Sequence, residues 1–104
     1  MTTVAIMQPT YLPWLGYFDL IDQADVFIFL ESVQFDKRSW QQRNRIKTQN
    51  GELMLTVPVL SKGKFEQRIN DVMVDESQNF EKKHFNSICS NYNKSKFFHL
   101  YRNE

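Results

Sequence analysis

The sequence predicts an α/β fold in which an N-terminal βαβ unit is followed by a β-hairpin and a C-terminal helix. Two apolar runs of strand length, 4–7 and 26–30, flank a segment with helical spacing. An Asn-Gly pair separates two further strand candidates, and a helical pattern follows them. At 104 residues, the chain makes one domain or part of one.

The βαβ unit is predicted from consecutive segments. Residues 4–7 lack the polar alternation of a half-exposed strand and end just before Pro9, which indicates a buried strand. Apolar residues recur at helical spacing over 14–24. Residues 26–30 are again uninterruptedly apolar. Strand, helix and strand with short connections predict a right-handed, Rossmann-like crossover whose sheet must be covered on both faces.

The hairpin is predicted at Asn50-Gly51, between strand candidates 45–48 and 53–57. Asn-Gly tolerates the positive φ values of a type I′ turn. Pro58 ends the pairing of the second strand or places that strand at an edge.

The remaining segments give weaker predictions. Residues 32–39 are expected to form a loop or a short helix, 61–64 a turn, and 69–75 a weak strand. A helix is predicted from Phe80 to Tyr92, with Ser77 as its N-cap. Residues 97–101 begin another element. Two interpretations of it remain, a docked tail and an element cut short, and we favour the second.

Composition excludes several classes of protein. The formal net charge is +1, which gives no reason to expect nucleic acid or an anionic membrane as a partner. No stretch approaches the ~20 apolar residues of a membrane span, and no signal peptide is recognisable. Cys89 is the single cysteine, so no internal disulfide can form. We therefore expect a cytoplasmic, soluble protein.

The loop after the first strand is the first candidate site. Ligands of open α/β sheets bind beyond the carboxyl ends of the strands, next to a helix N-terminus. Gly16 permits close approach, and the nearby aromatic residues offer stacking faces. The binding candidates in this loop are Gln8, Tyr11, Trp14, Gly16 and Tyr17. The alternative is that the aromatic residues only pack the helix onto the sheet.

The basic segment is the second candidate site. Residues 36–48 include Arg43, Arg45 and Lys47, which share one face of a strand because side chains alternate. Guanidinium groups bind phosphate or carboxylate well, so an anionic ligand is expected, such as a nucleotide sugar or an amino acid. The alternative is a solvated face that pairs with Glu52 across the hairpin.

Few other residues carry chemistry. His84 lies among apolar helix positions and is more typical of a core residue than of a general base, which makes it a weak catalytic candidate. Cys89 shares the buried-looking face of that helix and resembles a small hydrophobe. One cysteine and two distant histidines support no metal site, so no metal is predicted.

Three sequence blocks together resemble the WbqC-like protein family. They are residues 4–18 (VAIMQPTYLPWLGYF), residues 33–47 with VQF and KRSWQQRNRIK, and residues 50–59 with NG and LTVPV. The resemblance implies that residues 1–104 are the N-terminal portion of one WbqC-like domain. Departures are mild: Glu31 and Ser32 stand where the family commonly has an acidic pair, and Met54 and Phe80 occupy positions that are often tryptophan.

The resemblance also implies a function. It points to biosynthesis of O-antigen lipopolysaccharide or another surface polysaccharide, with transfer of glycine as a suggested reaction. It extends the binding candidates to further residues of the second block, which are Gln34, Lys37, Arg38 and Asn44. Residues 14–17 also resemble the His-x-Gly-His loop of nucleotidyltransferases but lack both histidines, which argues against the same chemistry.

Our preferred hypothesis is therefore a transferase acting on a nucleotide- or lipid-linked sugar. No cofactor is predicted beyond ATP or a nucleotide sugar as a ligand. The rivals are a non-catalytic binding or assembly subunit that joins partner enzymes of polysaccharide synthesis, and an inactive truncated gene product.

Overall fold

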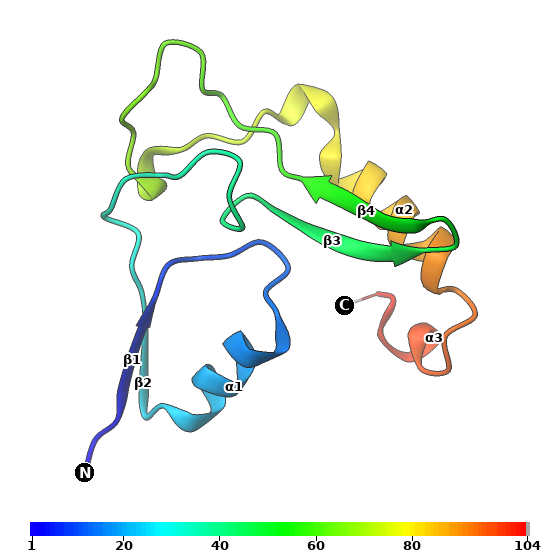
Figure 1. The fold of residues 1–104 in the computed structure, drawn as a ribbon, viewed down its shortest axis with the longest axis horizontal. Coiled ribbons are helices and arrows are strands. Elements are labelled where there is room, and N and C mark those ends of the chain that lie inside the picture. The colour runs from blue at the N-terminus through cyan, green and yellow to red at the C-terminus, as the bar shows by residue number, and fades with distance from the viewer. Residues whose placement is uncertain (104) are drawn as a thin grey trace.

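A computed structural model describes residues 1–103, and its elements follow the predicted order (Figure 1). The βαβ unit consists of β1 (Val4–Met7), α1 (Leu15–Gln23) and β2 (Val26–Phe29). The two strands pair in parallel, with Val4 opposite Val26 and Met7 opposite Phe29. The predicted mixed α/β fold with a βαβ start is confirmed.

Tyr17 fixes α1 on one face of this small sheet. Its ring is 2% exposed and lies 5.5 Å from the ring of Phe27. Its hydroxyl donates a hydrogen bond to the backbone carbonyl of Gln8, at 2.9 Å. This single buried residue therefore joins the helix to the loop that leaves β1.

The opposite sheet face is left open. It carries four β-branched side chains in two register pairs, Val4 with Val26 and Ile6 with Ile28, each 43–55% exposed. A parallel sheet is ordinarily covered on both faces, so this surface is an apolar patch that lacks a cover within residues 1–103.

The hairpin forms where expected, but its turn differs from the prediction. β3 (Arg43–Thr48) and β4 (Gly51–Thr56) pair antiparallel, with Thr48 opposite Gly51. The two turn residues are thus Gln49 and Asn50, and only Gly51 takes a positive φ, +113°. The prediction of a type I′ turn centred on Asn50-Gly51 is therefore wrong. The Thr48 hydroxyl stabilises the observed turn, because it accepts from the Asn50 N–H and donates to the Gly51 carbonyl.

The segment before the late helix also corrects two predictions. Residues 69–75 are not a strand. They contain the 3-10 helix η1 (Ile69–Asp71), and only Val74 bridges to Val59. Ser77 is not the N-cap of α2 (Phe80–Tyr92). It lies in η2 (Glu76–Gln78), where the Asp75 carboxylate accepts from its N–H and hydroxyl.

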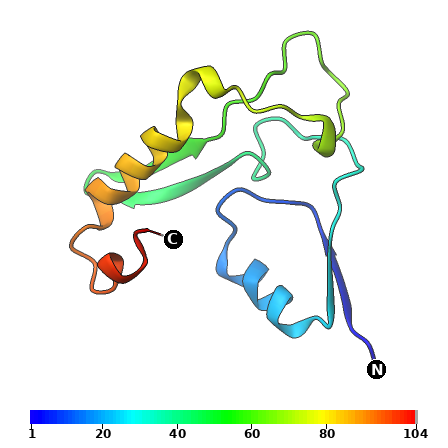
Figure 2. The same cartoon turned by 180° about the vertical axis from the view of Figure 1, so that it is seen from behind.

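α2 covers one face of the hairpin, as Figure 2 shows from behind. Leu55 is 4% exposed beneath it, and the Lys47 N–H donates to the Tyr92 hydroxyl at 2.8 Å. After a turn, α3 (Phe98–Tyr101) follows. The hairpin and α2 form a second small layer beside the βαβ unit (Figure 1).

Candidate functional site

A pocket of about 430 Å³, lined by both polar and apolar side chains, lies at the carboxyl ends of β1 and β2. Ligands of open α/β sheets bind at this edge. The pocket is roofed by the loop between β2 and β3. It is lined by Ile6, Met7, Gln8, Thr10, Leu30, Asp36, Ser39, Trp40 and Gln41.

Hydrogen bonds hold this loop against the end of β1. The side-chain amide of Gln41 donates to the side-chain oxygen of Gln8 and accepts from the backbone N–H of Asp36, the latter at 2.9 Å. The Ser39 hydroxyl donates to the Asp36 carbonyl. The polar lining of the pocket is therefore organised by bonds within the chain.

Gln42 fixes the neighbouring turn from inside. Its side chain is buried, accepts from the Arg38 N–H at 2.7 Å and donates to the Val57 carbonyl at 2.9 Å. Both ends of this buried amide are thus satisfied. The bonds support Arg38 at a φ of +63° and connect the loop to the end of β4.

Of the loop candidates, Gln8 lines this pocket, whereas the others have different surroundings. Trp14 is half exposed and meets the Tyr17 ring edge-on at 5.3 Å. A Cβ at Gly16 would lie 2.4 Å from the Trp14 indole nitrogen, so the glycine admits that side chain. Tyr17 is buried. These contacts are those of the packing alternative, and ligand contact by these residues stays a prediction.

Tyr11 and His84 meet between the two layers. The Tyr11 hydroxyl lies 2.7 Å from Nδ1 of His84, and the imidazole is buried. Burial lowers the pKa of His84, against the effect of a backbone hydrogen bond with Thr56. Burial, with the nearby Glu81 carboxylate, raises the pKa of Tyr11. This geometry joins β1, β4 and α2 through neutral groups.

The predicted basic face exists on β3. Arg43, Arg45 and Lys47 alternate with Asn44 and Ile46, and the amide of Asn44 donates to the Leu12 carbonyl on the other face. Arg45 forms an ion pair with Glu52 at 2.9 Å, with the two side chains 49% and 66% exposed. An ion pair in this exposed setting contributes little to stability, so an anionic ligand can replace Glu52 as the partner of Arg45.

Trp40 connects the basic face to the pocket. Its ring lines the pocket, and the guanidinium carbon of Arg45 lies 5.2 Å from the ring centroid. The other candidates of the second block are exposed: Lys37 lies in the loop, and Gln34 forms an isolated bridge with Arg68. The structure thus places Gln8 and Trp40 in one pocket with Arg45 over the Trp40 ring, whereas Gln34 is not among the residues that line this pocket.

Four residues that line or support the pocket were not predicted from the sequence as site residues: Asp36, Trp40, Gln41 and Gln42. Trp40 and the two glutamines stand in the second resemblance block, which was the available signal. No periodicity distinguishes a loop residue that closes a pocket. An apolar groove of about 740 Å³ between α2 and residues 95–102 was also not anticipated.

Metal binding has no support in the described part of the chain. Among residues 1–103, no three His, Cys, Asp or Glu side chains are grouped to hold an ion. No helix there is long and apolar enough to cross a membrane.

The βαβ unit, the hairpin and α2 define a small mixed α/β domain by class. A model of the WbqC-like protein family matches residues 8–104. The chain belongs to this family.

A relative from Mycobacterium tuberculosis, the uncharacterized protein Rv1507c, is 44% identical over 98 residues. The match covers 94% of this chain and 42% of that protein, so the chain spans less than half of the relative's length. No solved structure matches the chain.

Proposed function

We propose that the protein is the substrate-binding part of a transferase that acts on a nucleotide- or lipid-linked sugar. The pathway would be synthesis of O-antigen or another surface polysaccharide, in the cytoplasm. One observation carries the proposal: Trp40 places the carboxyl-edge pocket and the cation of Arg45 side by side. A ligand with a polar group and an anionic group would bridge the two.

The roles follow from the geometry. Arg43, Arg45 and Lys47 hold the phosphates of the carrier or the carboxylate of an amino acid such as glycine. Gln8 and the loop around Trp40 orient the rest of the substrate. Catalysis is then positioning and charge stabilisation. His84 receives no proton-transfer role, because it is buried and hydrogen-bonded to Tyr11.

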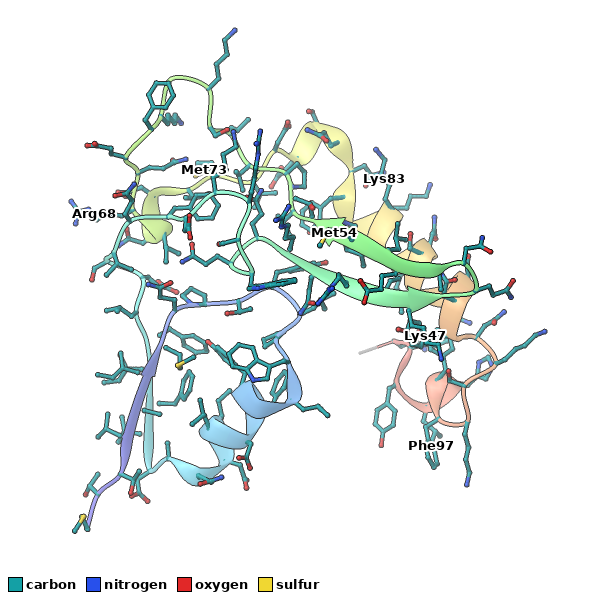
Figure 3. All side chains as sticks on the ribbon, viewed as in Figure 1. Lys47, Met54, Arg68, Met73, Lys83 and Phe97 are labelled. Atoms are coloured by element: carbon teal, nitrogen blue, oxygen red, sulfur yellow. The ribbon has the colours of Figure 1, made fainter. Side chains whose placement is uncertain are left out.

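Calorimetric titration with UDP-linked and GDP-linked hexoses tests this function. The double variant Arg43→Ala, Arg45→Ala should weaken binding at least about tenfold, because two charge-assisted contacts are lost. The matched control is Lys82→Ala, Lys83→Ala. It removes the same charge from α2, where Lys83 lies far from β1 and β2 (Figure 3). Equal loss in both variants would contradict a site on β3.

A second candidate function is an assembly subunit that binds partner enzymes. The open face formed by Val4, Ile6, Val26 and Ile28 favours it, because an apolar patch of this kind marks a protein-binding surface. Co-purification with an enzyme of the same pathway, abolished by Val4→Thr with Val26→Thr but unaffected by the arginine variants, would support this function over the first.

A further inference from the structure

The carboxyl-edge pocket is chemically unlike a phosphate site. Its lining includes the acidic residue Asp36 and, among the described residues, no lysine or arginine. A phosphate placed there would face a like charge without a neutralising cation. Phosphate sites ordinarily use guanidinium groups, lysines or free backbone N–H groups. The pocket therefore suits an uncharged polar group.

The hydrogen-bond network fixes what the pocket offers. The Gln41 oxygen accepts from the Asp36 N–H, so its NH₂ group must donate to the Gln8 oxygen. The NH₂ group of Gln8 then remains as a donor, and the Asp36 carboxylate as an acceptor. Neither has a hydrogen-bond partner within residues 1–103. A hydroxyl both donates and accepts, so neighbouring hydroxyls of a ligand match this pair.

Trp40 adds an apolar contact to the donor and acceptor of the pocket. Trp40 is half exposed and lines the same pocket, so its indole can supply an apolar contact beside the two polar groups. A ring with hydroxyls at its edge and C–H groups on its face needs this combination. The guanidinium of Arg45, on the Trp40 ring, marks where an attached phosphate would lie.

We propose that this pocket is a sugar-ring subsite: Gln8 and Asp36 bind hydroxyls, Trp40 contacts the ring face, and the phosphates remain outside on β3. This proposal rests on the proposed function, because it places the sugar of one ligand in the pocket and the phosphates of the same ligand on the basic face. The pocket volume of about 430 Å³ is sufficient for a small-molecule fragment of this kind.

The test compares each nucleoside diphosphate with its sugar-linked form by calorimetry, using UDP, UDP-glucose, UDP-galactose, GDP and GDP-mannose. In the unmodified protein, the best sugar-linked form should bind about tenfold more tightly than its free diphosphate, the share of one or two hydrogen bonds. Asp36→Asn and Trp40→Ala should bring this ratio close to one, and Trp40→Phe should restore part of it. Asp22→Asn, on the exposed surface of α1, is the charge-matched control and should keep the ratio.

The outcomes separate the two proposals. Equal binding of the free and sugar-linked diphosphates, still dependent on Arg43 and Arg45, would overturn the sugar subsite and leave the proposed function standing. Tighter UDP binding in Asp36→Asn would show that an anion occupies the pocket and would also overturn the subsite. Absence of binding by every nucleotide would overturn the proposed function together with the subsite.

Discussion

At the residue scale, the contact between Tyr11 and His84 ties three parts of the chain together. Tyr11 comes from the loop after β1, His84 from α2, and Thr56, the backbone partner of His84, from the end of β4. Tyr11 is partly buried and His84 is buried, so losing one of the two leaves the other without its hydrogen bond away from water.

Tyr11→Phe tests the strength of this joint. The variant keeps the ring but leaves Nδ1 of buried His84 without its partner, and we expect the free energy of unfolding to fall by about 1–3 kcal/mol. Urea unfolding followed by circular dichroism measures it. Tyr101→Phe, on an exposed residue of α3, is the matched control and should change it by less than about 0.5 kcal/mol.

The pH dependence of stability tests the neutral state of His84. Burial lowers the folded-state pKa of this base, so the unfolded chain binds its proton first as pH falls below about 6.5. Stability should therefore be retained above that pH and decline as pH falls toward the lowered pKa. His84→Gln should flatten this part of the pH profile. A wild-type profile that is flat between pH 7 and pH 5.5 would contradict the lowered pKa.

At the element scale, the hairpin depends on one residue at its turn. Gly51 opens β4 with a φ of +113°, a conformation that residues with a Cβ rarely adopt, and Asn50 keeps an ordinary φ. The Thr48 side chain, rather than an Asn-Gly pair, organises this turn. Correct strand register, in turn, places Arg43, Arg45 and Lys47 together on the outer face.

Two alanine substitutions distinguish the observed turn from a type I′ turn. Gly51→Ala should cost about 1–3 kcal/mol of stability, because it forces a Cβ into a strained φ. Asn50→Ala should cost less than about 0.5 kcal/mol, since its backbone N–H still donates to Thr48. A type I′ turn would make both substitutions costly. Thermal unfolding of the two variants provides the comparison.

At the scale of the whole molecule, the chain exposes more surface than a compact monomer does. Its accessible area is 8313 Å², against about 6,200 Å² expected for 12.5 kDa. The radius of gyration is 15.9 Å, where about 13 Å is usual for this length. Figure 1 shows why: the βαβ unit and the hairpin with α2 lie beside each other as two thin layers. The open face of β1 and β2 is one part of this excess.

Paired substitutions on and off this face test its role. Ile6→Thr with Ile28→Thr should reduce binding of the apolar dye ANS and change the free energy of unfolding by less than about 1 kcal/mol, since both side chains are half exposed. Leu55→Ala should instead cost about 2–5 kcal/mol, as for other buried leucines. A large loss of stability in the threonine variant would show that the face is already covered.

The sequence predicts some of this organisation because some signals are local. Uninterrupted apolar runs and helical spacing place β1, α1 and β2 correctly, and alternation places the cations on one face of β3. The role of Ser77 was mispredicted because its N–H and hydroxyl donate to the Asp75 carboxylate within η2, and α2 begins only after Asn79. The pocket roof depends on Gln41 reaching Gln8 across 33 residues, a contact that no periodicity encodes. Tyr17 was predicted to stack on a ligand, and it lies buried against the sheet. Its position in the sequence is compatible with both roles, so the sequence did not distinguish them.

The binding of a sugar nucleotide across the carboxyl-edge pocket and β3 is tested most directly by a ¹H–¹⁵N correlation spectrum. The protein is titrated with the sugar nucleotide that binds most tightly. If the sugar nucleotide binds at the proposed site, the peaks of Gln8, Trp40 and Arg45 should shift together, since the three residues surround one ligand. A well-dispersed spectrum that shows no shifts, or shifts only in residues 95–102 beside the apolar groove, would contradict it.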